Sequence, residues 1–305
     1  MRVILLGAAA GGGSPQWNCW CPVCRAARET PPRAVPRTQS SIAVSADGAR
    51  WFLGNASPDV RAQIARLPMK LSTAMRRSPV EGIVLTDAEL DHTLGIPLLR
   101  EGRAHHLWAT RAVLDILAEG SHLLPVTQAF ATVRATELAP ARPTELVYGD
   151  GSPSGLTVEA IAVAGDPPRF APGAPPGHTS AIIVRDPTTG GACAYAPACG
   201  ALDDSLRTRL AAADLVVFDG TCWSDDEMRS LGVSDRTATA MGHIPISGPM
   251  GSLEPLRSIA ANGRTRVVYC HINNTNPVLV EGSVERRAVE AAGIAVGADG
   301  MAFTV

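Results

Sequence analysis

Short apolar runs recur along the whole chain, each about as long as one β-strand. The predicted strands are Arg2–Gly7, Ser41–Ser45, Trp51–Leu53, Gly82–Leu85, Leu107–Ala109, Leu156–Val163, Ala181–Val184, Leu215–Phe218 and Val267–Cys270. The first run resembles the start of a secretory signal peptide, but it is short for one and is preceded by a single positive side chain, Arg2. We therefore predict a buried first strand that leads into a glycine-rich turn.

Helix-like segments follow several of these strands. The predicted helices are Pro58–Leu67, Arg111–Ala118, Leu202–Ala212, Leu253–Ala261 and Val284–Ala292. Gly120, Gly263 and Gly293 stand where a glycine would end a helix. Gly190 and Gly191 separate two strand-like runs, which predicts a hairpin.

Strands and helices thus alternate from one end of the chain to the other, with hairpins between some of the strands. This order favours a layered α/β sandwich over an all-parallel sheet. The chain shows no internal repeat or clear interdomain linker, and the proline-rich stretches Pro31–Pro36 and Pro167–Pro176 are interpreted as loops. We expect a single domain over residues 1–305.

Composition narrows the classes of protein to consider. Apolar residues make up 46% and charged residues 18% of the chain, as in ordinary globular proteins. A net charge of -2, with only 4% aromatic residues, argues against nucleic acid as the main partner. No apolar run is long enough to cross a bilayer, so we expect a cytoplasmic protein without a membrane partner.

Three of the seven cysteines, Cys19, Cys21 and Cys24, lie within six residues of one another. An odd number with such crowding does not indicate a secreted disulfide framework. The density is typical of a structural zinc site that lacks its fourth ligand, so we predict a metal-binding loop near residues 18–25. A redox pair or a chance cluster is the alternative.

Polar, metal-ligating side chains stand at the ends of four apolar strands. Asp91 and His92 follow the strand Gly82–Leu85, and His178 precedes the strand at Ala181. Asp219 and His271 each end an apolar strand. One such residue could be the first solvated position of its strand, and an Asp-His pair could be a carboxylate orienting a core histidine. Four in this order predict one shared metal site.

The order of these residues resembles the metallo-β-lactamase superfamily, whose motifs are a Thr-His-x-His-x-Asp-His-x-x-Gly box, a Gly-His-Thr, a strand-terminal Asp and a strand-terminal His. Thr86, Asp91, His92 and Gly95 fit the box, and His178, Asp219 and His271 fit the later motifs. The resemblance implies an αββα sandwich, in which two mixed sheets pack face to face with helices outside.

The chain departs from the box where its first two histidines are replaced by Asp87 and Glu89. The resemblance implies that Asp91, His92 and His271, with Asp219, form an intact metal site, while the other site keeps only Asp87, Glu89 and His178. Two histidines and a carboxylate are also the ligand set of non-haem Fe(II) oxygenases.

Longer strings resemble one family of this superfamily, PqqB, the coenzyme PQQ (pyrroloquinoline quinone) synthesis protein B family. They are Ala8–Cys24, Pro36–Val44, Asn55–Asp59 and His271–Pro277, and the resemblance covers essentially the whole chain. It implies iron-dependent, O₂-using hydroxylation of a tyrosine-derived ring in PQQ biosynthesis. The expected partners are the PQQ precursor, as a small molecule or peptide, and other proteins of the pathway.

The remaining site residues follow from this interpretation. His178 and Asp87 would act as proton donors or acceptors near the metal. The turn Gly11–Gly13 brings backbone towards the metal rim, with Gln16, Trp17 and Glu89 as candidate substrate contacts, or else it is a plain strand connection. For the cysteine cluster, the resemblance indicates Asn274 as the fourth ligand, and His243 competes with it as a stronger ligand type.

Two other functions stay open. A zinc-dependent hydrolase would activate water on the metal, and it would require the first site to fill despite Asp87 and Glu89. A non-catalytic PQQ carrier would bind its ligand without turnover.

Overall fold

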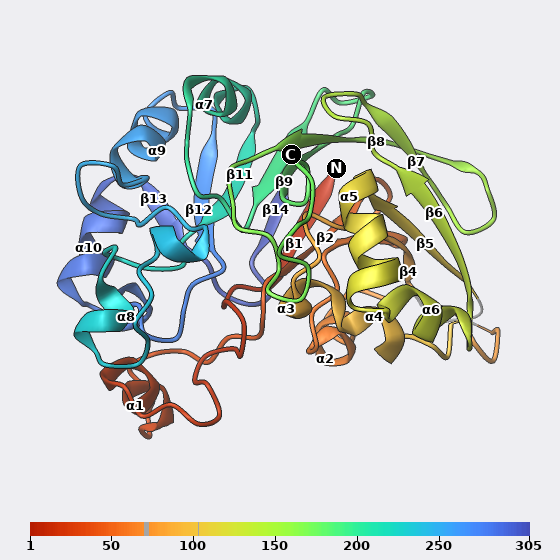
Figure 1. Cartoon of the computed structure of the whole chain (residues 1–305). Helices are drawn as coiled ribbons and strands as arrows, with labels where there is room; N and C mark the ends of the chain where they lie inside the picture. Colours follow the sequence, from red (N-terminus) through yellow and green to blue (C-terminus); the bar gives the residue numbers. More distant parts are fainter. Residues whose placement is uncertain (70–72, 103) are drawn as a thin grey trace.

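Two mixed β-sheets form the centre of the molecule (Figure 1). The computed structural model describes residues 1–69, 73–102 and 104–305. In spatial order, the first sheet contains β14 (Ala302–Thr304), β1 (Arg2–Gly7), β2 (Ser41–Ser45), β3 (Trp51–Gly54), β4 (Val80–Val84), β5 (Ala104–Ala109) and β6 (Thr132–Glu137). The second contains β13 (Ile294–Val296), β12 (Arg266–Cys270), β11 (Leu215–Asp219), β10 (Ala192–Ala196), β9 (Ser180–Arg185), β8 (Pro153–Ala162) and β7 (Thr144–Val147).

Each sheet is antiparallel at one end and parallel at the other. Strands β3 to β6 pair in parallel, as do β10 to β13. The antiparallel end of the first sheet begins with β14 beside β1, so the two ends of the chain lie close together, and the Met1 ammonium donates to the carbonyl of Val305 at 2.7 Å. The parallel strands carry their carboxyl ends to one rim of the molecule.

The alternation of side chains along the strands gives each sheet two apolar faces. The inner faces form one core, in which Phe52 and Trp108 of the first sheet belong to the same buried cluster as Val184 and Tyr195 of the second. The outer faces form separate cores beneath the helices. Truncating Phe52 to alanine in such a core would cost about 3–5 kcal/mol of unfolding free energy.

Helices cover both outer faces (Figure 1). The outer side of the first sheet carries α2 (Val60–Ile64), α4 (Gly95–Leu98), α5 (Arg111–Asp115) and α6 (Leu123–Gln128). The outer side of the second carries α1 (Pro22–Arg28), α7 (Asp204–Ala211), α9 (Leu253–Ala260) and α10 (Val284–Ala291). The predicted αββα sandwich is confirmed. In the described part of the chain, no helix is both long and apolar enough to cross a membrane.

The predicted strands are all present, Arg2–Gly7 and Ser41–Ser45 with the predicted bounds and the others with shifted ends, and the hairpin around Gly190 joins β9 to β10. The predicted helices are present but shorter, because their ends are set by caps such as Asp203, whose carboxylate accepts from the Leu206 N–H at 2.7 Å. Gly263 and Gly293 take the expected positive φ, +73° and +74°. The prediction for Gly120 is wrong: the chain continues α5 as a π-helical turn, Ile116–Gly120, and His122 is the left-handed residue beyond it.

Candidate metal centre

Three of the predicted ligands meet at the carboxyl-terminal rim of the sheets. Asp91 and His92 lie on the short helix α3 (Leu90–Thr93) beyond β4, and His271 directly follows β12. Their donor atoms all lie within 4.8 Å of one another. His92 and His271 face each other edge to face, with ring centroids 5.1 Å apart. Residues separated by 180 positions in sequence thus form one candidate site.

The loop that carries Asp91 and His92 is fastened to the strand beside it. Asn55 accepts from the Thr86 backbone N–H at 3.0 Å and donates to the Thr86 hydroxyl at 2.9 Å. A side chain at Gly95 would bring its Cβ to 2.3 Å from the Ser57 carbonyl oxygen. Thr86 and Gly95 therefore serve the local geometry, and they hold His92 at a fixed position.

Asp87 lies behind His92 and sets the protonation of its ring. Both carboxylate oxygens lie 2.8 Å from His92 Nδ1, and the Thr86 hydroxyl donates to the same carboxylate at 2.6 Å. Because a carboxylate only accepts, Nδ1 carries a proton, so in the neutral ring the lone pair lies on Nε2. That Nε2 is buried and has no hydrogen-bond partner in the described part of the chain. A buried lone pair without a donor fits a metal ion.

His271 is held by Thr221 on the side away from Asp91. Its Nδ1 lies 2.9 Å from the Thr221 hydroxyl, and its Nε2 lies 3.1 Å from Asp91 Oδ2. The backbone of His271 has φ +52°, a left-handed conformation that costs energy for a residue with a side chain. The strained turn directs the ring back into the site.

A second group of donors shares His271. Asp219, His243 and His271 offer ligand atoms within 4.8 Å of one another. Asp219 Oδ2 lies 2.6 Å from His243 Nδ1, and the Thr221 hydroxyl donates to Asp219 Oδ1 at 2.7 Å. His243 stacks on His271 with ring centroids 5.1 Å apart. The structure thus places His243 at the candidate metal centre and away from the cysteine cluster, which removes it as the fourth ligand there.

The charge of the site favours a cation. Burial raises the pKa of Glu89 to about 7, and the negative charges of Asp87 and Asp91 add to this shift. Burial would lower the pKa of His92, yet the carboxylates of Asp87 and Asp91 raise it to about 9. Both shifts show that acidic groups crowd the site. Asp91, His92 and His271 therefore fit a metal ion in charge and in donor type.

The site opens into two adjoining cavities. The inner cavity, of about 380 Å³, is lined by His92, His243 and His271 together with Asp87, Glu89, Asp91 and Thr221. The outer cavity, of about 470 Å³, is lined by Gly11, Gly12, Leu90, Leu94, Phe170 and Arg236 among others. Gly11 and Gly12 line its wall, as expected of a turn that brings backbone close to the metal site. A Cβ on Gly11 would lie only 3.4 Å from the Asp91 side chain.

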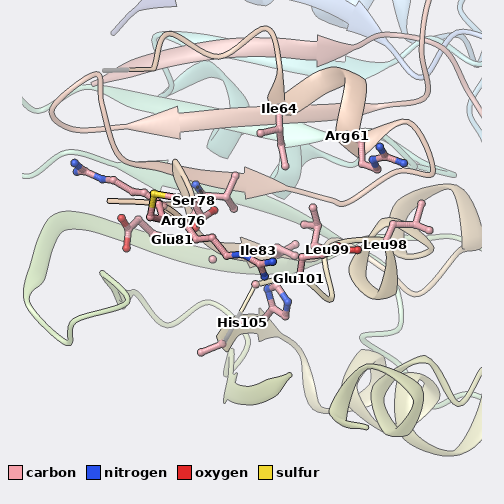
Figure 2. Close-up of a pocket in the computed structure, with 16 residues that line it drawn as sticks. Arg61, Ile64, Arg76, Ser78, Glu81, Ile83, Leu98, Leu99, Glu101 and His105 are labelled. Carbon is pink, nitrogen blue, oxygen red and sulfur yellow. Dashed lines mark hydrogen bonds between the residues drawn. The ribbon is translucent and has the colours of Figure 1, made fainter. Parts of the chain in front are cut away.

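A larger hollow, of about 1070 Å³, lies away from these residues. Figure 2 shows its walls, with Arg61 and Ile64 from α2 and with Glu81 and Ile83 from β4. It lies beside the amino-terminal half of β4, whereas the candidate metal centre lies beyond the carboxyl-terminal end of that strand. None of the predicted site residues lines this hollow.

The other predicted site residues differ in whether they line the two cavities. Glu89 lines both cavities. His178 is half-buried and its Nδ1 lies 2.9 Å from the Thr179 hydroxyl; Thr179 lines the inner cavity, whereas His178 does not. Gln16 lines a separate hollow beside the cysteine cluster, and Trp17 is 83% exposed. The structure brings Glu89 to the site and leaves Gln16 and Trp17 outside its cavities.

The thiols of Cys19, Cys21 and Cys24 also lie within 4.8 Å of one another. Cys21 begins α1, and its sulfur accepts from the Cys24 N–H at 3.4 Å. Asn274 lies against this group, with its side-chain nitrogen Nδ2 3.2 Å from Cys24 Sγ and its backbone carbonyl oxygen 3.4 Å from Cys21 Sγ. Of the two candidates for a fourth ligand, Asn274 is therefore the one that lies against the cysteine cluster.

Sequence reasoning did not single out Thr221, Asn273, Met241 or Arg169, all of which line the inner cavity. Thr221 stands two positions after Asp219 on the same rim, and Asn273 two positions after His271. Their closeness in sequence to the predicted ligands could have identified them as residues of the site. Met241 ends the 3-10 helix Thr239–Met241, two positions before His243. Arg169 lies on the loop between β8 and β9, with no motif beside it, so only the fold brings it to the site.

The comparisons with known proteins agree with this geometry. Residues 50–272 match the family model described as Beta-lactamase superfamily domain. The chain is 42% identical to "Coenzyme PQQ synthesis protein B" of Methylobacterium radiotolerans, with 100% of both chains covered. It is 43% identical to the protein of the same name from Pseudomonas aeruginosa, with 99% of both covered.

Solved structures give the same relationship. The crystal structure of Zn(2+)-bound PqqB from Methylobacterium extorquens superimposes with a TM-score of 0.89 at 39% identity, over 100% of both chains. A diphosphatase from the PhnP family superimposes with a TM-score of 0.65 at 19% identity, over 100% of this chain and 97% of the other, and this likeness concerns the fold alone. The chain belongs to the coenzyme PQQ synthesis protein B family, PqqB, within the metallo-β-lactamase superfamily.

Proposed function

We propose that this protein acts in PQQ biosynthesis as an iron-dependent enzyme that uses O₂ to hydroxylate a tyrosine-derived ring of the PQQ precursor. The names of its relatives support the pathway. The observation that carries the chemistry is the donor set of Asp91, His92 and His271 around the unpartnered Nε2 of His92. Two imidazoles and one carboxylate are the ligands of non-haem Fe(II) oxygenases.

Bound Fe(II) would supply the redox chemistry that activates O₂. For a catechol, the reaction balances without another reductant: the ring gives up two electrons and two protons. One oxygen atom of O₂ enters the ring, the other leaves as water, and the product is a hydroxyquinone. A phenol would require two electrons and two protons from an external donor such as ascorbate.

The residues of this chain would position the reactants. Asp87 would orient His92 through Nδ1, and Thr221 would orient His271 in the same way. With both carboxylate oxygens against His92, Asp87 fits this orienting role better than the expected role of proton donor or acceptor. His178 would act beyond Thr179, at the edge of the inner cavity.

A zinc-dependent hydrolase is the second candidate. The group Asp219, His243 and His271 favours it, because a second metal beside the first is typical of hydrolases that activate water between two ions. The relative from Methylobacterium extorquens is Zn(2+)-bound.

We also infer that Cys19, Cys21 and Cys24, with Asn274, hold a structural zinc ion. Three thiolates within reach of one point, on a loop and the first turn of the helix that follows it, are typical of such sites. The ion would fix α1 against the second sheet.

The experiment that tests the proposed function is O₂ uptake by protein reconstituted anaerobically with Fe(II). A catechol-bearing amino acid should be consumed in proportion to O₂. Protein loaded with Zn(II) should show no uptake, because zinc has no redox chemistry. Absence of uptake by the Fe(II) form, with hydrolysis by the Zn(II) form, would favour the second candidate.

A further inference from the structure

An arginine without a partner lies on the wall shared by the two cavities. Arg169 belongs to the loop between β8 and β9, and it lines both the inner and the outer cavity. Within residues 1–69, 73–102 and 104–305, its guanidinium makes no hydrogen bond and no ion pair. Arg236, the other arginine of the outer cavity, differs in this respect: it donates to Asp166 at 3.0 Å. Arg169 is therefore an exposed cation at the edge of the site, and no anion of the described chain is paired with it.

The cavities meet at residues that line both. These are Gly11, Glu89, Asp91, Asp166, Arg169 and Met241. The inner cavity holds the imidazoles of the candidate metal centre. The outer cavity has an apolar wall of Pro58, Leu90, Leu94 and Phe170. A molecule with a ring in the inner cavity would extend its substituent along this apolar wall, past Arg169.

Charge indicates what that substituent carries. The outer cavity is lined by the acidic residues Glu89, Asp91 and Asp166 and by two arginines, one of which is already paired with Asp166. The negative charge of Asp91 would be neutralised by the metal that it binds. The single free guanidinium can offset one negative charge, and its planar fork matches a carboxylate. A phosphate dianion would leave a second charge facing Glu89.

We propose that Arg169 binds a carboxylate of an aromatic, amino-acid-type substrate and so determines which aromatic compounds the enzyme accepts. The proposal rests on the proposed function in one respect, that the ring lies at the metal centre. It adds a specificity-determining residue, Arg169, which selects ring compounds that carry a carboxylate on the side chain.

The test compares L-DOPA with its carboxamide, which has the same ring and amine but no carboxylate. Binding is measured by calorimetry on the Zn(II)-loaded protein, so that no turnover is required. The wild-type protein should bind L-DOPA about tenfold more tightly than the carboxamide, as expected for one charge-assisted pair. Arg169→Gln should remove this preference, and Arg169→Lys should retain part of it because lysine keeps the charge without the fork.

The matched control is Arg142→Gln, which removes the same charge from an exposed arginine that lines neither cavity. Its preference for L-DOPA should equal that of the wild type. The proposal is overturned if the wild type does not distinguish the two compounds, if it binds neither, or if Arg169→Gln keeps the full preference. Because binding is measured without O₂, failure of O₂ uptake by the Fe(II) form would contradict the proposed function and leave this result standing.

Discussion

His92 connects the sequence of this protein with its chemistry more directly than any other residue. Its Nδ1 is committed to Asp87, and its buried Nε2 faces Asp91 and His271. We expect His92→Ala and His271→Ala each to abolish binding of the active-site metal, because each removes one of three ligands. Glu89→Ala should change first-metal affinity much less. The metal content of each variant after dialysis tests these expectations, and circular dichroism verifies that each variant is folded. Loss of metal in Glu89→Ala but not in His271→Ala would contradict the assignment of His271, and not Glu89, as a ligand of the first metal.

Asp87 provides a separate test at the same scale. Asp87→Asn removes the carboxylate that fixes the Nδ1 proton of His92, so metal affinity should fall about 10- to 100-fold. Competition with a chelator gives the affinity. Asp166→Asn is the control, since it removes an acid from the same cavity without touching His92. An equal loss in both variants would show that only the summed charge matters.

The element that depends most on a metal is α1 with the loop before it. Cys21→Ala should release about one equivalent of zinc and lower the melting temperature, while metal at Asp91 and His92 is retained. Cys193→Ala is the control: it removes a buried thiol from the core between the sheets, where none of the three clustered cysteines lies, and it should lower stability without releasing zinc. Unchanged zinc content in Cys21→Ala would exclude the structural site.

Helix α8 (Glu227–Ser230) begins with a buried acid. Burial raises the pKa of Glu227 to about 7 from an ordinary value of 4.5, although the Trp223 N–H and the Thr275 hydroxyl both donate to it at 2.6 Å. Between these two values the folded state holds a proton that the unfolded state has lost. The contribution of Glu227 to stability is therefore present below pH 4.5 and lost as pH rises towards 7.

Glu227→Gln should remove this dependence. Relative to the variant, the wild type should lose about 1–3 kcal/mol of unfolding free energy between pH 5 and pH 7. Urea unfolding of both proteins at the two pH values gives the difference. If the unfolding free energies of the two proteins differ by the same amount at both pH values, the raised pKa of Glu227 is contradicted. A difference that does not change with pH would come from the altered hydrogen bonds alone.

At the scale of the whole molecule, the apolar runs predicted the central strands because those strands are buried on both faces. The strand β6 was missed for the opposite reason: it lies at the edge of the first sheet, and most of its side chains face solvent. Cys19, Cys21 and Cys24 were found because they are close in sequence. His243 stayed open as one of two candidates for the fourth ligand of that cluster, since only the packing of its loop shows that it lies against Asp219. Arg169 carried no local signal. The expectation of a single domain stays a prediction.

The central claim is that this fold holds iron for oxygen chemistry. Its most direct test is the fate of labelled O₂ supplied to the Fe(II)-reconstituted protein with a catechol-bearing substrate. The account predicts one labelled oxygen atom in each hydroxylated ring, and none with the Zn(II)-loaded protein. Product without label, together with zinc-dependent cleavage of an ester or phosphodiester and no O₂ uptake by the Fe(II) form, would contradict it.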